Sequence, residues 1–107
     1  MTVPEVEARD VPEGAYLLDV REQNEWDAGH APEAVHIPMT QIQARVEEVP
    51  ADRQVYVVCR VGGRSFQVAA WLNQIGRDAV NVDGGMQAWA HDKRPMVSET
   101  GQTPFVA

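Results

Sequence analysis

Cysteine is almost absent from this sequence, which has a single thiol, Cys59, among its 107 residues. One cysteine can form no disulfide within the chain and cannot build a multi-cysteine zinc site. Long apolar runs are absent too, since no segment approaches the roughly 18 apolar residues of a membrane span. The N-terminal MTVPEVEARD lacks the apolar region of a signal peptide. We therefore expect a cytoplasmic protein, in a reducing compartment, without a membrane segment.

Positive charge is also scarce. Nine Lys and Arg residues stand against sixteen Asp and Glu residues, and the net charge is −7. A nucleic-acid-binding surface needs a basic face, and an anionic membrane repels an acidic protein, so the composition argues against both kinds of partner. A local basic site for a small anion is still compatible with this composition, because binding depends on the charges near the site.

The apolar residues, 44% of the chain, fall into short runs that alternate with helix-like segments. Strands are predicted over 15–20, 34–37, 54–58 and 78–83. Helices are predicted over 22–29, 41–49, 65–76 and 85–92. This alternation predicts one three-layer α/β/α domain over residues 1–97, with a small, mainly parallel central sheet. Residues 98–107 are polar up to Phe105 and are expected to form a C-terminal tail.

Ligands collect at the carboxyl ends of the strands in folds of this class. The residues that stand at these ends are Asp19, Arg21, His36, Cys59, Asp83, Gly84 and Gly85. The lone thiol therefore lies where binding sites form, whereas a purely structural cysteine more often lies in the middle of a strand.

The segment VVCRVGGRS, residues 57–65, links a predicted strand to a predicted helix. Gly62 and Gly63 allow the backbone to curl so that its amides point inward, next to the partly positive start of the helix. Arg60 and Arg64 add full positive charge. These features favour a thiolate at Cys59 and indicate a nucleophile with its own anion cradle. The alternative is a buried structural cysteine followed by arginines on a solvated loop.

Other polar residues near the strand ends have two interpretations each. Asp19 could orient Arg64 or a loop amide, or it could form a structural ion pair with Arg21. His30 and His36 could act as acid–base groups, but a structural hydrogen bond is the better interpretation of His30.

Three blocks of the sequence resemble the rhodanese-like family, specifically its single-domain sulfurtransferases. The blocks are LLDVREQNEWDAGHAPEAVHIP (17–38), VVCRVGGRSFQVAAWL (57–72) and VDGGMQAW (82–89). Their order and separation match the family over about residues 3–97. The chain departs from the usual family pattern at Ala31, Glu33 and Arg94, and none of these departures lies in the loop around Cys59.

The resemblance implies thiosulfate sulfurtransferase activity through a persulfide on Cys59. The loop residues implied to bind the substrate are Arg60, Val61, Gly62, Gly63, Arg64 and Ser65, with Asp19 and Arg21 in support. The implied donor is a small anion such as thiosulfate, and the acceptor is cyanide, a cellular thiol or a partner protein. No metal or organic cofactor is implied. With no second cysteine, an external acceptor must take the sulfur.

Two other functions are compatible with these residues. Phosphatases with a similar fold use a Cys-x5-Arg loop, and arsenate-reductase chemistry is related; the spacing from Cys59 to Arg64 is Cys-x4-Arg, a tighter ring that suits a single sulfur atom better. A non-catalytic binding module is the third interpretation, although inactive rhodanese-like domains usually lack the cysteine. A carrier that passes persulfide to a partner protein cannot be separated from the enzyme by sequence.

Overall fold

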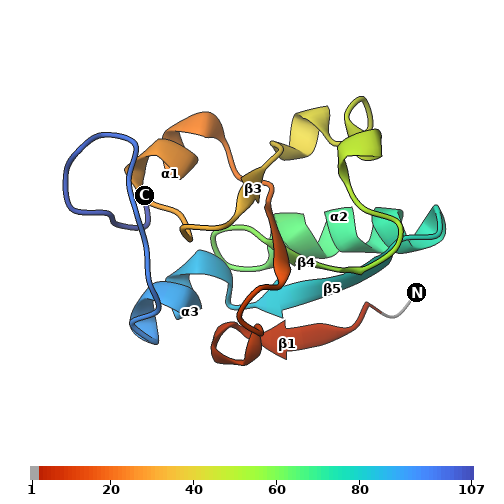
Figure 1. Cartoon of the computed structure of the whole chain (residues 1–107), viewed down its shortest axis with the longest axis horizontal. Coiled ribbons are helices and arrows are strands. Elements are labelled where there is room, and N and C mark those ends of the chain that lie inside the picture. Colours follow the sequence, from red (N-terminus) through yellow and green to blue (C-terminus); the bar gives the residue numbers. More distant parts are fainter. Residues whose placement is uncertain (1–2) are drawn as a thin grey trace.

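The computed structural model describes residues 3–107. Met1 and Thr2, at the start of the predicted domain, lie outside the described residues. The centre of the molecule is a five-stranded sheet, in which every neighbouring pair of strands is parallel (Figure 1). Its strands, in spatial order, are β1 (Glu5–Glu7), β5 (Asp78–Asp83), β4 (Gln54–Val58), β2 (Tyr16–Asp19) and β3 (Val35–His36).

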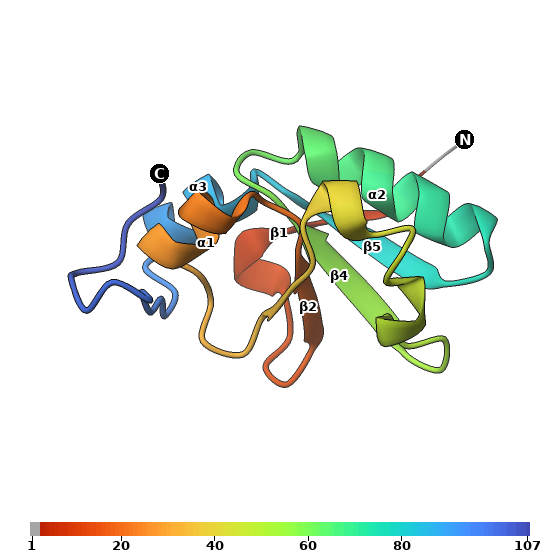
Figure 2. The same cartoon turned by 90° about the horizontal axis from the view of Figure 1, so that it is seen from above.

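Helices cover both faces of this sheet. The α-helices are α1 (Gln23–Ala28), α2 (Gly63–Gln74) and α3 (Gly85–His91), and the 3₁₀ helices are η1 (Ala8–Asp10), η2 (Met39–Gln41) and η3 (Val46–Glu48). Helix α2 packs on one face with the segment between η2 and η3, while α3 packs on the other face with η1 (Figure 2). The predicted three-layer α/β/α fold is therefore confirmed.

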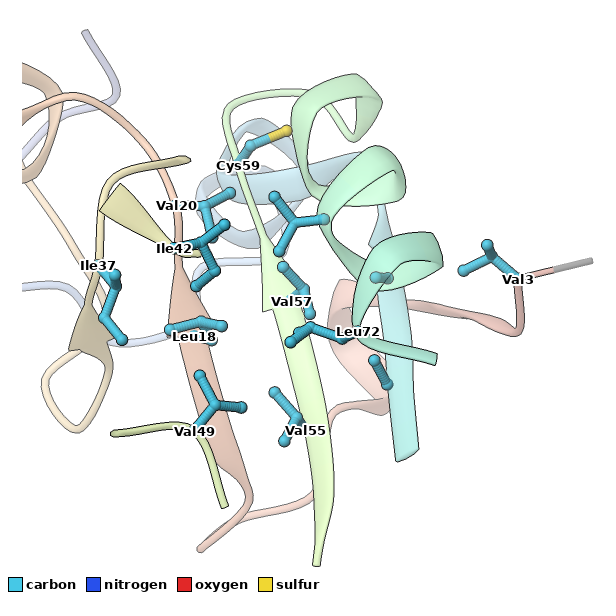
Figure 3. Packing of buried hydrophobic residues seen from close by; sticks show 13 residues of the cluster. Val3, Leu18, Val20, Ile37, Ile42, Val49, Val55, Val57, Cys59 and Leu72 are labelled. Atoms are coloured by element: carbon cyan, nitrogen blue, oxygen red, sulfur yellow. The ribbon is translucent and has the colours of Figure 1, made fainter. Parts of the chain in front are cut away.

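The two faces of the central strands have separate cores. Leu18 and Val57 pack with Leu72 of α2 on one face (Figure 3). Leu17 and Val58 pack with α3 on the other face. Successive side chains of a strand point to opposite faces, so a strand that is buried on both sides needs a continuous apolar run. The apolar runs of β2 and β4 thus place these strands at the centre of the sheet.

The predicted helix over 41–49 is wrong. The structure has η2 and η3 instead, joined by turns, with Arg45 in a non-helical conformation at φ −115° and ψ 19°. The apolar spacing identified the buried side chains correctly, since Ile42 and Val49 lie in the core. Tighter 3₁₀ turns bury the same side chains in this short segment, whose ends are set by Pro38 and Pro50.

Strand β1 was not predicted. Its sequence, Glu-Val-Glu, contains one apolar residue, and it pairs in parallel with β5 at the sheet edge, with Val6 opposite Val82. The sequence of so short an edge strand has almost no periodic pattern, so its extended conformation depends on pairing with β5.

The C-terminal segment lies along α1 (Figures 1 and 2). The backbone amides of Glu99 and Phe105 donate to the carbonyls of Asp27 and Ala28, and Val97 forms an antiparallel bridge with His30. These contacts hold residues 97–105 against the domain, and the boundary at residue 97 stays a prediction. Within residues 3–107, no helix has the length and apolar character to cross a membrane.

Candidate active site

Cys59 lies immediately after β4, at the carboxyl end of the sheet. Its side chain is buried, with 1% of the residue exposed, and its sulfur points toward the first turn of α2 (Figure 3). Strand β4 has β5 and β2 as hydrogen-bonded neighbours, so the base of the thiol is held from both sides. The backbone of Cys59 is therefore held rigidly at the carboxyl end of the sheet, where parallel sheets bind ligands.

The loop after Cys59 curls back over the sulfur. Gly62 adopts φ +118°, a left-handed conformation that a residue with a Cβ rarely takes, and it forms the N-cap of α2. In this conformation its backbone N–H donates to the Cys59 sulfur at 3.1 Å. The left-handed conformation of Gly62 thus turns a backbone N–H of the strand-to-helix turn toward the sulfur.

Ser65, in the first turn of α2, brings a second donor to the sulfur. Its Oγ lies 3.2 Å from Cys59 Sγ, and the residue is completely buried. Burial alone would raise the pKa of the thiol, but the Ser65 hydroxyl and the backbone amides of Ser65, Gly62 and Val61 outweigh that effect. The pKa of Cys59 is therefore lowered from its ordinary value, which favours the nucleophilic thiolate.

Helix α3 holds the other side of the loop. The backbone amides of Met86 and Gln87 donate to the carbonyls of Cys59 and Arg60 at 2.8 and 3.0 Å. A Cβ on Gly85 would lie 2.5 Å from the Cys59 carbonyl oxygen and 2.6 Å from that of Arg60. The absence of a side chain at Gly85 is thus what lets the start of α3 approach the loop.

Arg64 forms a two-point ion pair with Glu25 of α1. Its two terminal nitrogens lie 2.7 and 2.9 Å from the two carboxylate oxygens of Glu25. Hydrogen bonding to Arg64 is the main cause that lowers the pKa of Glu25 to about 2, against the opposing effect of burial. The charge of Arg64 is therefore largely balanced within the protein, and its guanidinium ties α1 to α2.

Glu25 was missed by the sequence analysis. The sequence does contain a helix-capping pattern at this residue, because Glu22 and Glu25 stand three residues apart at the start of α1 and form a capping box. The capping pattern predicts the helix start but contains no sign of a partner 39 residues away.

The remaining charged residue of the loop, Arg60, is exposed, as is Val61 with 53% of its surface accessible. Val61 borders an open depression together with Gly84, Gln87, Ala88 and His91 of the α3 region. Within residues 3–107 Arg60 forms no ion pair, so it carries the unbalanced positive charge of the loop, beside a shallow surface with apolar parts.

Asp19 and Arg21 form an ion pair that is completely buried. The Arg21 guanidinium donates to both carboxylate oxygens of Asp19, at 2.7 to 3.1 Å, and to the carbonyl of Gly29 at 2.8 Å. Within residues 3–107, the side-chain hydrogen bonds of Asp19 all come from Arg21. The pair joins the end of β2 to the turn after α1, and it does not extend to Arg64.

The ring of Trp26, a residue of α1, stacks with the rings of two histidines. The Trp26 ring is parallel to those of His30 and His36, at centroid distances of 3.5 and 4.7 Å. Both ring nitrogens of His30 have acceptors, the carbonyl of Ala31 and the carboxylate of Glu99, at 2.8 and 2.7 Å. These histidines thus hold backbone and tail in place, and their hydrogen bonds do not involve the loop around Cys59.

A hollow of about 430 Å³ lies elsewhere on the molecule. It is lined by residues that include Leu17, Ala31, Trp89, Arg94 and Pro95, and by none of the residues 59–65. We therefore identify the candidate site by the geometry around the sulfur.

Comparisons with known sequences give consistent results. The sequence-family model of the rhodanese-like domain matches residues 3–92. The Bacillus subtilis (strain 168) protein named "Putative sulfurtransferase YtwF" is 41% identical over 86 residues, which cover 80% of this chain and 84% of that protein. An Allochromatium vinosum protein named "Sulfurtransferase" is 41% identical over 90 residues, covering 83% of this chain and 84% of that protein.

Solved structures show the same relationship. The rhodanese-related protein from Thermoplasma volcanium superposes with a TM-score of 0.83 at 30% sequence identity, over 88% of this chain and 97% of that one. On the evidence of the family match, the relatives and this superposition, the chain belongs to the rhodanese-like family.

Proposed function

We propose that the chain is a sulfurtransferase in which Cys59 carries a sulfane sulfur from a donor such as thiosulfate to a thiophilic acceptor. The observation that carries the proposal is the ring of donors around the Cys59 sulfur, from Ser65 and the backbone of Val61 and Gly62. The sulfurtransferase names of the relatives support the same chemistry.

The proposed reaction has two steps. First, the Cys59 thiolate attacks the outer sulfur of thiosulfate; a new S–S bond forms, the old S–S bond breaks, and sulfite leaves with its electron pair. Second, an acceptor nucleophile attacks the outer sulfur of the persulfide and releases the Cys59 thiolate. With cyanide as acceptor the product is thiocyanate, and with a thiolate it is a new persulfide.

The charges near the loop support different proposed roles for its two arginines. Arg60 is exposed and attracts the anionic donor, while Arg64 is held by Glu25 and braces the loop against α1. Hydrogen-bond donors at the start of α2 then stabilise the negative charge on the outer sulfur of the persulfide.

The sulfur must leave to an external acceptor. Cys59 is the single cysteine of the chain, so no second thiol can resolve the persulfide as an internal disulfide. Val61 and Phe66 are exposed on the loop and on the first turns of α2. These apolar side chains suit a thiol acceptor carried on a larger molecule, such as a partner protein.

Phosphatase or arsenate-reductase chemistry is the second candidate. A phosphate-binding loop needs its arginine free to bind the oxyanion with both nitrogens. In this protein both terminal nitrogens of Arg64 bind Glu25 instead. This pairing, together with the Cys-x4-Arg spacing, favours sulfur transfer.

Intact-mass measurement after incubation with thiosulfate tests the proposal. We expect an adduct of one sulfur atom on the wild-type chain and none on Cys59→Ser, with release of that sulfur as thiocyanate on addition of cyanide. Turnover of an aryl phosphate without a sulfur adduct would instead favour the phosphatase. A folded protein with neither activity would favour a non-catalytic binding module.

A further inference from the structure

The Ser65 hydroxyl is shared between two acceptors. Its oxygen lies 3.2 Å from the Cys59 sulfur and 2.6 Å from the side-chain oxygen of Asn81, a residue of β5. Ser65 and Asn81 are both buried, at 0% and 1% exposure. A hydroxyl has one proton, so Ser65 can donate to the sulfur or to Asn81 but not to both at full strength.

The orientation of the Asn81 amide follows from its other partners. Its nitrogen lies 2.7 Å from a carboxylate oxygen of Glu5 and 3.2 Å from the carbonyl oxygen of Gly62. Both partners are acceptors, so the NH₂ group faces them and the amide oxygen faces Ser65. The hydrogen bond to the charged Glu5 is a strong one and opposes rotation of the amide.

Two hydrogen-bond arrangements follow. When Cys59 is a thiol, Ser65 donates to the Asn81 oxygen and the S–H donates to the Ser65 oxygen. When Cys59 is a thiolate, Ser65 turns its proton to the sulfur, and the buried Asn81 oxygen loses its donor. A buried acceptor without a donor is unfavourable, so Asn81 opposes the thiolate through Ser65.

Asn81 also contacts Gly62, the other residue that donates a hydrogen bond to the sulfur. Its NH₂ group holds the carbonyl of Gly62, whose own N–H donates to Cys59 at 3.1 Å. The amide therefore contacts both Ser65 and Gly62, which donate to the sulfur, while its anchor, Glu5, lies opposite Asn81 on the neighbouring edge strand β1.

We propose that Asn81, clamped by Glu5, is a positioning residue that competes with the Cys59 sulfur for the single hydroxyl proton of Ser65. This inference rests on the proposed nucleophilic role of Cys59 and requires no particular sulfur donor. Asn81 limits the thiolate in the resting protein and takes the proton of Ser65 back once the charge has left the sulfur, as in the persulfide.

Several charged or titratable groups lie on the loop or on the elements that pack around it, and they bear on the pH dependence of Cys59. They are Arg60 in the loop, Arg64 of α2 with its partner Glu25 of α1, Glu5 of β1, and His91 at the end of α3 beside Val61. A test must hold the total charge constant, because any substitution that changes it also acts directly on Cys59.

The pH profile of alkylation by iodoacetamide reports on Cys59 alone, since Cys59 is the single thiol. The double variant Glu5→Gln/Asn81→Asp has the same net charge as the wild type and can restore a hydrogen bond between positions 5 and 81. A carboxylate accepts a hydrogen bond from Ser65 more strongly than an amide does, so we expect the pH midpoint of the double variant to rise by about one unit relative to the wild type, a tenfold loss of thiolate below the midpoint.

The same comparison in a Ser65→Ala background separates the proposed route from direct electrostatics. We expect less than half of the shift to remain when the hydroxyl is absent. An equal shift with and without Ser65, or no shift in either background, would overturn the proposal. Neither result depends on sulfur transfer, so failure here is distinct from failure of the thiosulfate test.

Infrared spectroscopy of the wild-type chain provides a test that does not depend on whether any variant folds. Below the pH midpoint, the S–H stretching band of Cys59 is expected at the lowered frequency of a hydrogen-bonded thiol, because the S–H donates to Ser65. A band at the frequency of a free thiol would contradict the arrangement in which Asn81 holds the Ser65 proton.

Discussion

The carboxylate of Glu25 and the guanidinium of Arg64 face each other over two short hydrogen bonds, of 2.7 and 2.9 Å, between helices α1 and α2. The loop that surrounds the Cys59 sulfur lies directly before this arginine. The ion pair therefore fixes one end of the sulfur-binding loop to a helix formed almost 40 residues earlier.

Removal of this ion pair should destabilise the protein in a pH-dependent way. The folded pKa of Glu25 is lowered to about 2, so its contribution is complete above the ordinary carboxyl pKa and is lost as the pH falls toward 2. With allowance for solvent around Arg64, we expect Glu25→Gln to lower the free energy of unfolding by about 1–2 kcal/mol at pH 7. Urea denaturation at pH 7 and pH 3 measures the change, with exposed Glu47→Gln as control. An equal effect at both values would contradict the assignment.

The two loop arginines should differ in their effects on catalysis. Arg60→Gln removes an exposed charge, so we expect a KM for thiosulfate about two- to fivefold higher with unchanged stability. Arg64→Gln leaves the partly buried Glu25 carboxylate without its cation, and we expect a loss of stability together with a lower kcat. Steady-state kinetics and thermal unfolding of both variants make the comparison. The same effect from both substitutions would argue against the separate roles.

The hydroxyl of Ser65 should lower the pKa of the Cys59 thiol. A hydrogen bond to a charged group contributes about 1.5–3 kcal/mol, so the loss of this hydroxyl in Ser65→Ala is expected to raise the thiol pKa. The pH profile of alkylation measures this value directly, and Ser98→Ala in the C-terminal segment is the matched control. An unchanged midpoint in Ser65→Ala would show that the backbone amides suffice.

A methyl group at position 85 should disrupt the contact between α3 and the loop. Gly85 has φ +56° and its Cβ would meet two backbone carbonyls, so we expect Gly85→Ala to cost about 2–4 kcal/mol and to slow sulfur loading. Gly14→Ala separates the two causes, because Gly14 has φ +78° and open space around it. Equal losses of stability in both variants would mean that the backbone conformation alone is responsible.

The buried pair of Asp19 and Arg21 should be costly to break and cheaper to replace. Arg21→Met leaves an uncompensated buried carboxylate, and we expect a loss of about 3–5 kcal/mol. The double variant Asp19→Leu/Arg21→Met removes both charges and should recover much of that loss. Chemical denaturation of the two variants tests the expectation, and a double variant less stable than Arg21→Met would refute it.

The pattern of residues predicted the central architecture well because buried parallel strands and amphipathic helices have strong local signals. The runs that form β2 and β4 are apolar on both faces, and α2 has helical spacing over its whole length. Where the local signal was weak, prediction failed. The segment 41–49 had helical spacing but forms two 3₁₀ turns, and the short strand Glu5–Glu7 has its conformation from β5.

The sequence alone determined that Cys59 ends a strand, that Gly62 follows it in a sharp turn, and that a helix begins there, since all three are neighbours in the chain. The tertiary structure decided which groups complete the site. Glu25 of α1 and Asn81 of β5 reach the loop, Glu5 of β1 holds Asn81, and no local pattern records such partners. A hydrogen bond depends on the distance between two atoms in space, and only folding brings these distant parts of the chain within 3 Å of one another.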